Sequence, residues 1–143
     1  MEASGDPRLA KGVAEFNQGL YFECHETLEE VWLEEHGEDR LFYQGLIQVA
    51  AGSFKWEQGV PAGAIKLWRA GLEKLGGYPE IHLGVDLASF VRAVKGNLTE
   101  VEAACRDGQA APALNAPALR LARGSARGAP PIKSTRKGLA GKP

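Results

Sequence analysis

Residues 8 to 60 contain no proline, and their apolar side chains recur three and four positions apart. That spacing places apolar side chains on one face of a helix, whereas a half-buried strand alternates polar and apolar residues. Pro7 and Pro61 flank this region, at positions where proline opens a helix rather than breaks one. No stretch of the sequence alternates as a strand does. The sequence therefore predicts an all-α fold.

Periodicity and helix breakers predict a series of helices joined by short connections. Short connections favour antiparallel neighbours, so we expect a compact bundle of four to five helices. The segment 39–58 is apolar around nearly its whole circumference, which is typical of a central, buried helix and also leaves room for a homodimer interface. Its Gly45 and Gly52 predict close approach of a neighbouring helix. The expected helices span residues 7–19, 20–36, 39–58, 61–75 and 86–105.

The charges divide the chain into an acidic body and a basic tail. Residues 1–107 hold all 18 acidic residues, whereas the remaining 36 positions hold basic residues and no acid. We predict a flexible N-terminus over 1–7, a single helical domain over 8–106, and a disordered tail over 107–143 that is rich in Ala, Gly and Pro. Such a basic tail can make weak, salt-sensitive contacts with polyanions.

Location is indicated by what the sequence lacks. No segment approaches the roughly 18 apolar residues of a membrane-spanning helix. The first residues carry neither the basic nor the apolar region of a secretion signal. Cys24 and Cys105 are far apart and fit no metal-binding or redox spacing. These features predict a cytoplasmic protein with two free thiols and no membrane contact.

The segment 22–32 is the most informative stretch of the chain. On a helix, His25 and Glu29 lie one turn apart, on the face that also carries Tyr21 and Trp32. That face should be apolar, and an unpaired ionisable group there costs several kcal/mol. The pair is therefore either part of a hydrogen-bonded network or a working site. The opposite face is predicted to be solvated and carries Glu23, Thr27, Glu30 and Glu34.

A polar stripe on the segment 39–58 is expected to meet this pair. In a structural interpretation, Glu29 accepts hydrogen bonds from Gln44, Gln48 or Arg40 and orients His25. In a binding interpretation, the same residues line a pocket for a small polar ligand or meet a protein partner. The candidate cluster consists of Tyr21, His25, Glu26, Glu29, Trp32, Gln44 and Gln48, with Glu26 at its rim.

An enzymatic interpretation starts from the same residues. His25-Glu26-x-x-Glu29 is similar to the zinc-protease pattern H-E-x-x-H, with a carboxylate in place of the second imidazole. A metal-dependent or acid–base hydrolase centred on His25 and Glu29 is therefore the alternative function. The facing Gln44 and Gln48 are poor metal ligands, so we expect neither a metal nor another cofactor. A binding or structural role without catalysis is favoured.

Two motifs follow one another along the chain. The first is Phe16-Asn17-x-Gly19-x-Tyr21-Phe22-Glu23-x-His25-Glu26-x-Leu28-Glu29-x-x-Trp32, and the second is Gln44-Gly45-Leu46-Ile47-Gln48-x-Ala50-Ala51. Together they resemble the bacterial and archaeal family catalogued as domain of unknown function 309. Gly63-Ala64, Gly71-Leu72 and Gly84-Val85-Asp86-Leu87 continue the resemblance, which covers about residues 8 to 100. The resemblance implies an all-helical cytoplasmic protein with no assigned activity. Lys55 stands where the family often carries histidine, which removes an imidazole from any metal site.

Overall fold

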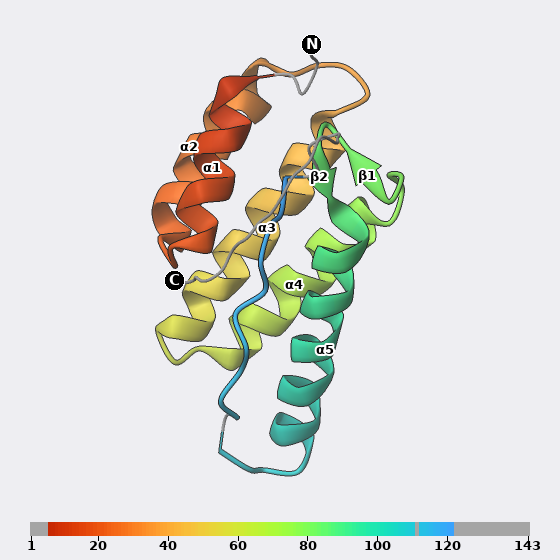
Figure 1. Cartoon of the computed structure of the whole chain (residues 1–143). Helices are drawn as coiled ribbons and strands as arrows, with labels where there is room; N and C mark the ends of the chain where they lie inside the picture. Colours follow the sequence, from red (N-terminus) through yellow and green to blue (C-terminus); the bar gives the residue numbers. More distant parts are fainter. Residues whose placement is uncertain (1–5, 111, 122–143) are drawn as a thin grey trace.

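The computed structural model describes residues 6–110 and 112–121, and this part of the chain folds into five α-helices (Figure 1). A short antiparallel pair, β1 (Ile81–His82) and β2 (Val85–Asp86), joins the fourth helix to the fifth. The predicted all-α fold is confirmed. The helices are α1 (Pro7–Asn17), α2 (Tyr21–Glu34), α3 (Arg40–Glu57), α4 (Pro61–Leu75) and α5 (Leu87–Arg106).

Local chemistry sets the helix boundaries. Asp6 accepts a hydrogen bond from the backbone N–H of Arg8 at 2.8 Å, and Pro7 occupies the first turn of α1. Asp86 caps α5 in the same way, through the N–H of Ser89 at 3.2 Å. Asp6 and Pro7 therefore belong to the helical body, and the rest of the predicted flexible N-terminus lies outside the described residues.

The central position of α3 is confirmed. It packs against α2 on one side and α4 on the other, and Figure 1 shows it between the α1–α2 pair and the α4–α5 pair. A Cβ atom added to Gly71 of α4 would lie 2.7 Å from the carbonyl oxygen of Gly45, and one added to Gly52 would lie 2.6 Å from the Trp68 ring. Small residues thus allow α3 and α4 to approach closely, as the sequence predicts for Gly45 and Gly52.

The buried face of α2 differs from the predicted one. Thr27, which we expected on a solvated face, is only 6% exposed. α1 covers this side, where a Cβ atom on Gly12 would lie 2.7 Å from Leu28. Because α2 buries Thr27 and Leu28, its His25 and Glu29 are half-buried at the edge of the core rather than at its centre.

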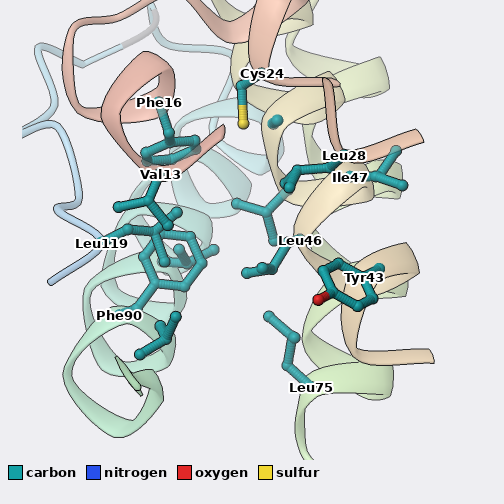
Figure 2. Packing of buried hydrophobic residues seen from close by; sticks show 14 of the residues in the cluster. Val13, Phe16, Cys24, Leu28, Tyr43, Leu46, Ile47, Leu75, Phe90 and Leu119 are labelled. Atoms are coloured by element: carbon teal, nitrogen blue, oxygen red, sulfur yellow. The ribbon is translucent and has the colours of Figure 1, made fainter. Parts of the chain in front are cut away.

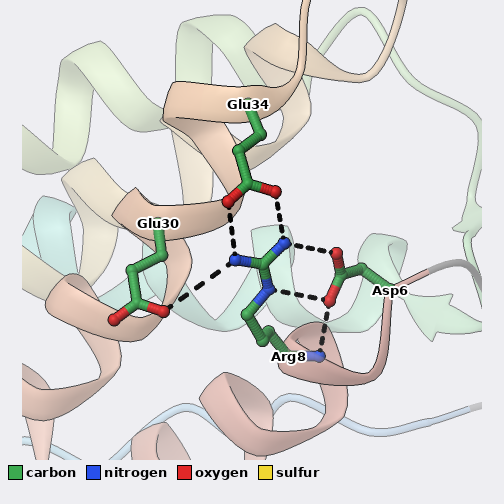
Figure 3. A network of polar contacts seen from close by, with 4 residues as sticks. All are labelled: Asp6, Arg8, Glu30 and Glu34. Atoms are coloured by element: carbon green, nitrogen blue, oxygen red, sulfur yellow. Dashed lines mark hydrogen bonds and ion pairs between the residues drawn. The ribbon is translucent and has the colours of Figure 1, made fainter.

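A polar network holds the outer edges of α1 and α2 together (Figure 3). The guanidinium of Arg8 lies 2.8 Å from carboxylates of both Asp6 and Glu34, and 3.9 Å from Glu30. Hydrogen bonds from Arg8 lower the pKa of Asp6 and of Glu34, and they raise the pKa of Arg8 itself. Glu30 and Glu34 are thus at the surface, as predicted.

The segment 112–121, which composition assigns to a disordered tail, packs along the helical body. Leu119 is only 2% exposed and joins the core cluster that contains Val13 and Phe90 (Figure 2). Asn17 of α1 donates from Nδ2 to the carbonyl oxygen of Leu119 at 2.8 Å and accepts from its N–H at 2.8 Å. The prediction of disorder is wrong for this segment, because composition alone does not show that Leu119 packs into the core. The remainder, 122–143, lies outside the described residues.

Candidate functional site

Two contacts define the interface between α2 and α3, which we call the α2–α3 seam. At one end, the rings of Phe22 and Phe54 lie with their centroids 5.5 Å apart. At the other end, the guanidinium carbon of Arg40 lies 4.1 Å from the centroid of the Trp32 ring. The two helices therefore run antiparallel. Gln48 is about midway between Arg40 and Phe54, so it lies level with the middle of α2.

The structure brings all seven predicted residues to α2 and α3, but they differ in exposure. The helical spacing of His25 and Trp32 turns both toward α3, whereas Glu29 lies further toward the outer surface. Glu26 is exposed, in keeping with its predicted place at the rim. The half-buried members are Tyr21, His25, Glu29, Trp32, Gln44 and Gln48.

The predicted hydrogen bonds to Glu29 are wrong. Arg40 donates from Nη1 to the backbone carbonyl oxygens of Trp32 at 3.0 Å and Glu35 at 2.8 Å, which lie at the C-terminal end of α2. Basic side chains are favoured there, because the last carbonyl groups of a helix have no partner within it. In the described part of the chain, no hydrogen bond joins Glu29 to Arg40, Gln44 or Gln48.

Three side chains at the seam contain a buried polar atom without a hydrogen-bond partner among the described residues. These atoms are Nδ1 of His25, Nε1 of Trp32 and Oε1 of Gln48. By contrast, the indole of Trp68 donates to Oγ of Ser53 at 3.3 Å. An unpaired buried polar group costs about 1–3 kcal/mol and is rare in native proteins. The seam therefore carries a donor, an acceptor and an imidazole nitrogen that can act as either.

Tyr21 belongs to the core next to the seam rather than to the unpaired set. Its ring packs edge-on against Phe16 of α1, with centroids 5.0 Å apart. Burial raises the pKa of the Tyr21 phenol, and the nearby carboxylate of Glu57 acts in the same direction. Tyr21 thus forms a wall at one end of the seam and remains uncharged at neutral pH.

Metal-ligating side chains are sparse at this position. Among the residues that the structure describes, no three His, Cys, Asp or Glu side chains lie close enough together to hold a metal ion. The seam offers His25 and Glu29, flanked by the amides of Gln44 and Gln48. Amide groups are weak ligands for the transition metals that imidazole prefers.

The sequence analysis did not predict a contact between His82 and Asp39. Nε2 of His82, in β1, lies 2.7 Å from Oδ1 of Asp39, which precedes α3. The imidazole packs against the rings of Phe42 and Tyr78, at centroid distances of 4.9 and 4.8 Å. No local pattern joins residues 43 positions apart in the sequence. The pair ties the β1–β2 turn to the start of α3, which is a structural role.

Comparison with known families supports the resemblance seen in the motifs. Residues 9–67 match the model of the family described as Domain of unknown function (DUF309). The matched stretch runs from α1 into α4 and contains the whole α2–α3 seam. No curated protein matches this sequence. Within the described residues, no helix is long and apolar enough to cross a membrane.

Proposed function

We propose that this protein is a binding module whose α2–α3 seam accepts a small polar ligand. The observation that supports this function is the set of three buried, unpartnered polar atoms on His25, Trp32 and Gln48. A purely structural network would pair these atoms with one another or with Glu29, because more than about 90% of buried polar groups in native proteins are paired. A ligand that supplies the missing partners would recover this cost on binding.

The arrangement of the unpaired atoms restricts the ligand. His25 and Trp32 are two helical turns apart, so their polar atoms are spread over about 10 Å of the seam. Gln48 lies between them from the facing helix. The ligand therefore has an elongated shape, with an acceptor for the Trp32 N–H and a donor for the Gln48 oxygen. The aromatic pair Phe22 and Phe54, at the end of the seam, favours a ligand that also has an apolar portion.

Charge restricts the ligand further. Eight acidic residues lie between positions 23 and 39, with no Lys or Arg among them. The guanidinium of Arg40 is engaged by the carbonyl groups of α2. The local potential therefore disfavours anions, and we infer an uncharged or cationic ligand.

The alternative, a metal-dependent or acid–base hydrolase centred on His25 and Glu29, makes a different prediction. Near-stoichiometric zinc, iron or manganese in untagged protein, lost in His25→Ala, would support it over the binding module. We expect metal well below stoichiometric amounts in both proteins, because the seam offers only His25 and Glu29 beside two amides. Elemental mass spectrometry measures this directly.

Thermal unfolding with a small set of probes tests the binding proposal. Butane-1,4-diol and 4-aminobutan-1-ol have the expected shape and charge, and each carries a hydroxyl group that can accept from Trp32. Adipate has a similar shape and the wrong charge. A ligand that binds only the folded state raises the melting temperature. We expect the diol or the amino alcohol, but not adipate, to raise the melting temperature of the wild type and not that of Gln48→Leu. An equal effect in both proteins, or no effect of any probe, would contradict the proposal.

The sequence and the structure support three further parts of the proposal. A cytoplasmic location is supported by the free thiols of Cys24 and Cys105. Weak polyanion contact through the basic tail is supported by the lack of acidic residues in 108–143. A homodimer interface on the outer surface of α2 and α3 is supported by exposed Phe22, Leu33 and Leu41.

A further inference from the structure

The segment 112–121, which we call the strap, runs in an extended path across the helical body (Figure 1). Asn17 of α1 contacts it near one end, through both hydrogen bonds to Leu119. Asn97 of α5 contacts it earlier in the sequence, donating from Nδ2 to the carbonyl oxygen of Asn115 at 2.9 Å. We call the surface between these two asparagines the strap groove.

The strap also adds to the short strand pair. The N–H of Asp86 in β2 donates to the carbonyl oxygen of Arg120 at 2.8 Å. Val85 and Leu121 form an antiparallel β-bridge. The end of the strap is therefore recognised as a further strand beside β2, which is how many proteins bind extended peptides.

The hydrogen bonds from Asn17, Asn97 and Asp86 all reach main-chain atoms of the strap. Asn17 engages both the N–H and the C=O of one residue, as a neighbouring strand does in an antiparallel pair. Asn97 and Asp86 each donate to a strap carbonyl. Such bonds do not depend on the side chains of the bound segment. Side-chain selection rests instead on Leu119, the one fully buried side chain of the strap.

We propose that the strap groove is a peptide-binding site, and that it accepts the strap of a second copy of this chain as well as its own. A second copy supplies the same segment, and exchange of identical segments between copies is a low-cost route to dimers. Release of the strap exposes Leu119 and the core residues that it covers, and it breaks hydrogen bonds that the strap of a second copy can restore atom for atom.

The test uses full-length protein whose own strap is weakened, Leu119→Asp, together with a fluorescent peptide of residues 112–121. The peptide stands for the strap of the second copy. We expect saturable binding by fluorescence anisotropy, at least tenfold weaker for a peptide that itself carries Leu119→Asp. The double variant Asn17→Ala and Leu119→Asp should lose binding as well. The wild type should bind the peptide more weakly than Leu119→Asp, because its own strap competes at high effective concentration.

Circular dichroism tests whether the Leu119→Asp protein keeps its helices. If the helices are lost, the Leu119→Ala protein is used in its place. A folded variant that fails to bind the peptide overturns the peptide-binding site. Sedimentation of Leu119→Asp mixed with Asn17→Ala then tests exchange between whole chains. We expect a heterodimer that neither protein forms alone. Peptide binding without a heterodimer overturns the second copy as the occupant. None of these outcomes depends on the α2–α3 seam, which lies on other helices.

Discussion

At the scale of single residues, Gly71 and Gly96 show how the surroundings of a glycine decide its role. A Cβ atom on Gly71 would lie 2.7 Å from the Gly45 oxygen and 2.8 Å from Val49, whereas one on Gly96 would meet nothing within 4 Å. We expect Gly71→Ala to lower the free energy of unfolding by about 1–3 kcal/mol through overpacking. Gly96→Ala should raise it by about 0.5–1 kcal/mol. Chemical denaturation measures both, and equal effects would contradict the close approach of α3 and α4.

Cys24 makes a residue-scale prediction about pH. Burial raises the pKa of its thiol from 9.0 to about 12, and burial likewise raises the pKa of Tyr43 from 10.0 to about 12. Because both groups ionise more readily in the unfolded chain, their contribution to stability is complete below pH 9 and is lost as the pH rises toward 12.

We therefore expect the free energy of unfolding to fall between pH 9 and 11, by at most about 1.4 kcal/mol per pH unit for each group. Urea denaturation across this range measures the slope. Cys24→Ala should make the slope shallower, whereas Cys105→Ser, at an exposed position, should leave it unchanged. A wild-type profile that is flat from pH 9 to 11 would show that neither group is buried in the folded state.

At the scale of elements, the unpaired oxygen of Gln48 predicts that a group needed for ligand binding lowers the stability of the unliganded protein. Leucine at this position removes a buried acceptor and keeps a similar side-chain volume. We expect Gln48→Leu to raise the free energy of unfolding by about 1–3 kcal/mol. Gln44→Leu, on the same stripe but with no unpaired buried atom, should change it by less than about 0.5 kcal/mol. Thermal and urea denaturation measure both, and destabilisation by Gln48→Leu would mean that this oxygen is paired in solution.

Helices and the seam differ in how far they could be predicted. Apolar spacing, Pro7 and Pro61 predict the helices because each signal is local. The pairing of α2 with α3 follows from their short connection. The hydrogen bonds within the seam could not be predicted in this way, because they depend on the orientation of α2 about its own axis when it packs against α1. That orientation buries Thr27 and places Glu29 further outward.

At the scale of the whole molecule, the strap extends the folded unit beyond the predicted boundary at residue 107. Composition identifies a segment rich in Ala and Pro but does not reveal that Asn17, about a hundred positions earlier, binds its backbone. Such long-range pairs leave no local pattern, and neither does the contact between His82 and Asp39. The fold class was therefore accessible from sequence, whereas the contacts that complete the molecule were not.

The strap makes a prediction for global stability. Leu119 is buried in the core cluster, whereas Leu121 is 43% exposed. We expect Leu119→Ala to lower the free energy of unfolding by about 2–5 kcal/mol and Leu121→Ala by less than about 0.5 kcal/mol. Urea denaturation of the two variants provides the comparison. Equal stability of the two would show that the strap is not part of the cooperative unit.

The central claim, that the α2–α3 seam binds a ligand, is tested most directly at the Trp32 indole. Each tryptophan gives its own indole N–H signal in an NMR spectrum of ¹⁵N-labelled protein, and Trp68 serves as an internal reference because it donates to Ser53. During titration with 4-aminobutan-1-ol or butane-1,4-diol, we expect the Trp32 signal to shift saturably while that of Trp68 stays in place. If neither probe moves the Trp32 signal, or if both signals drift together without saturation, the seam is not the binding site.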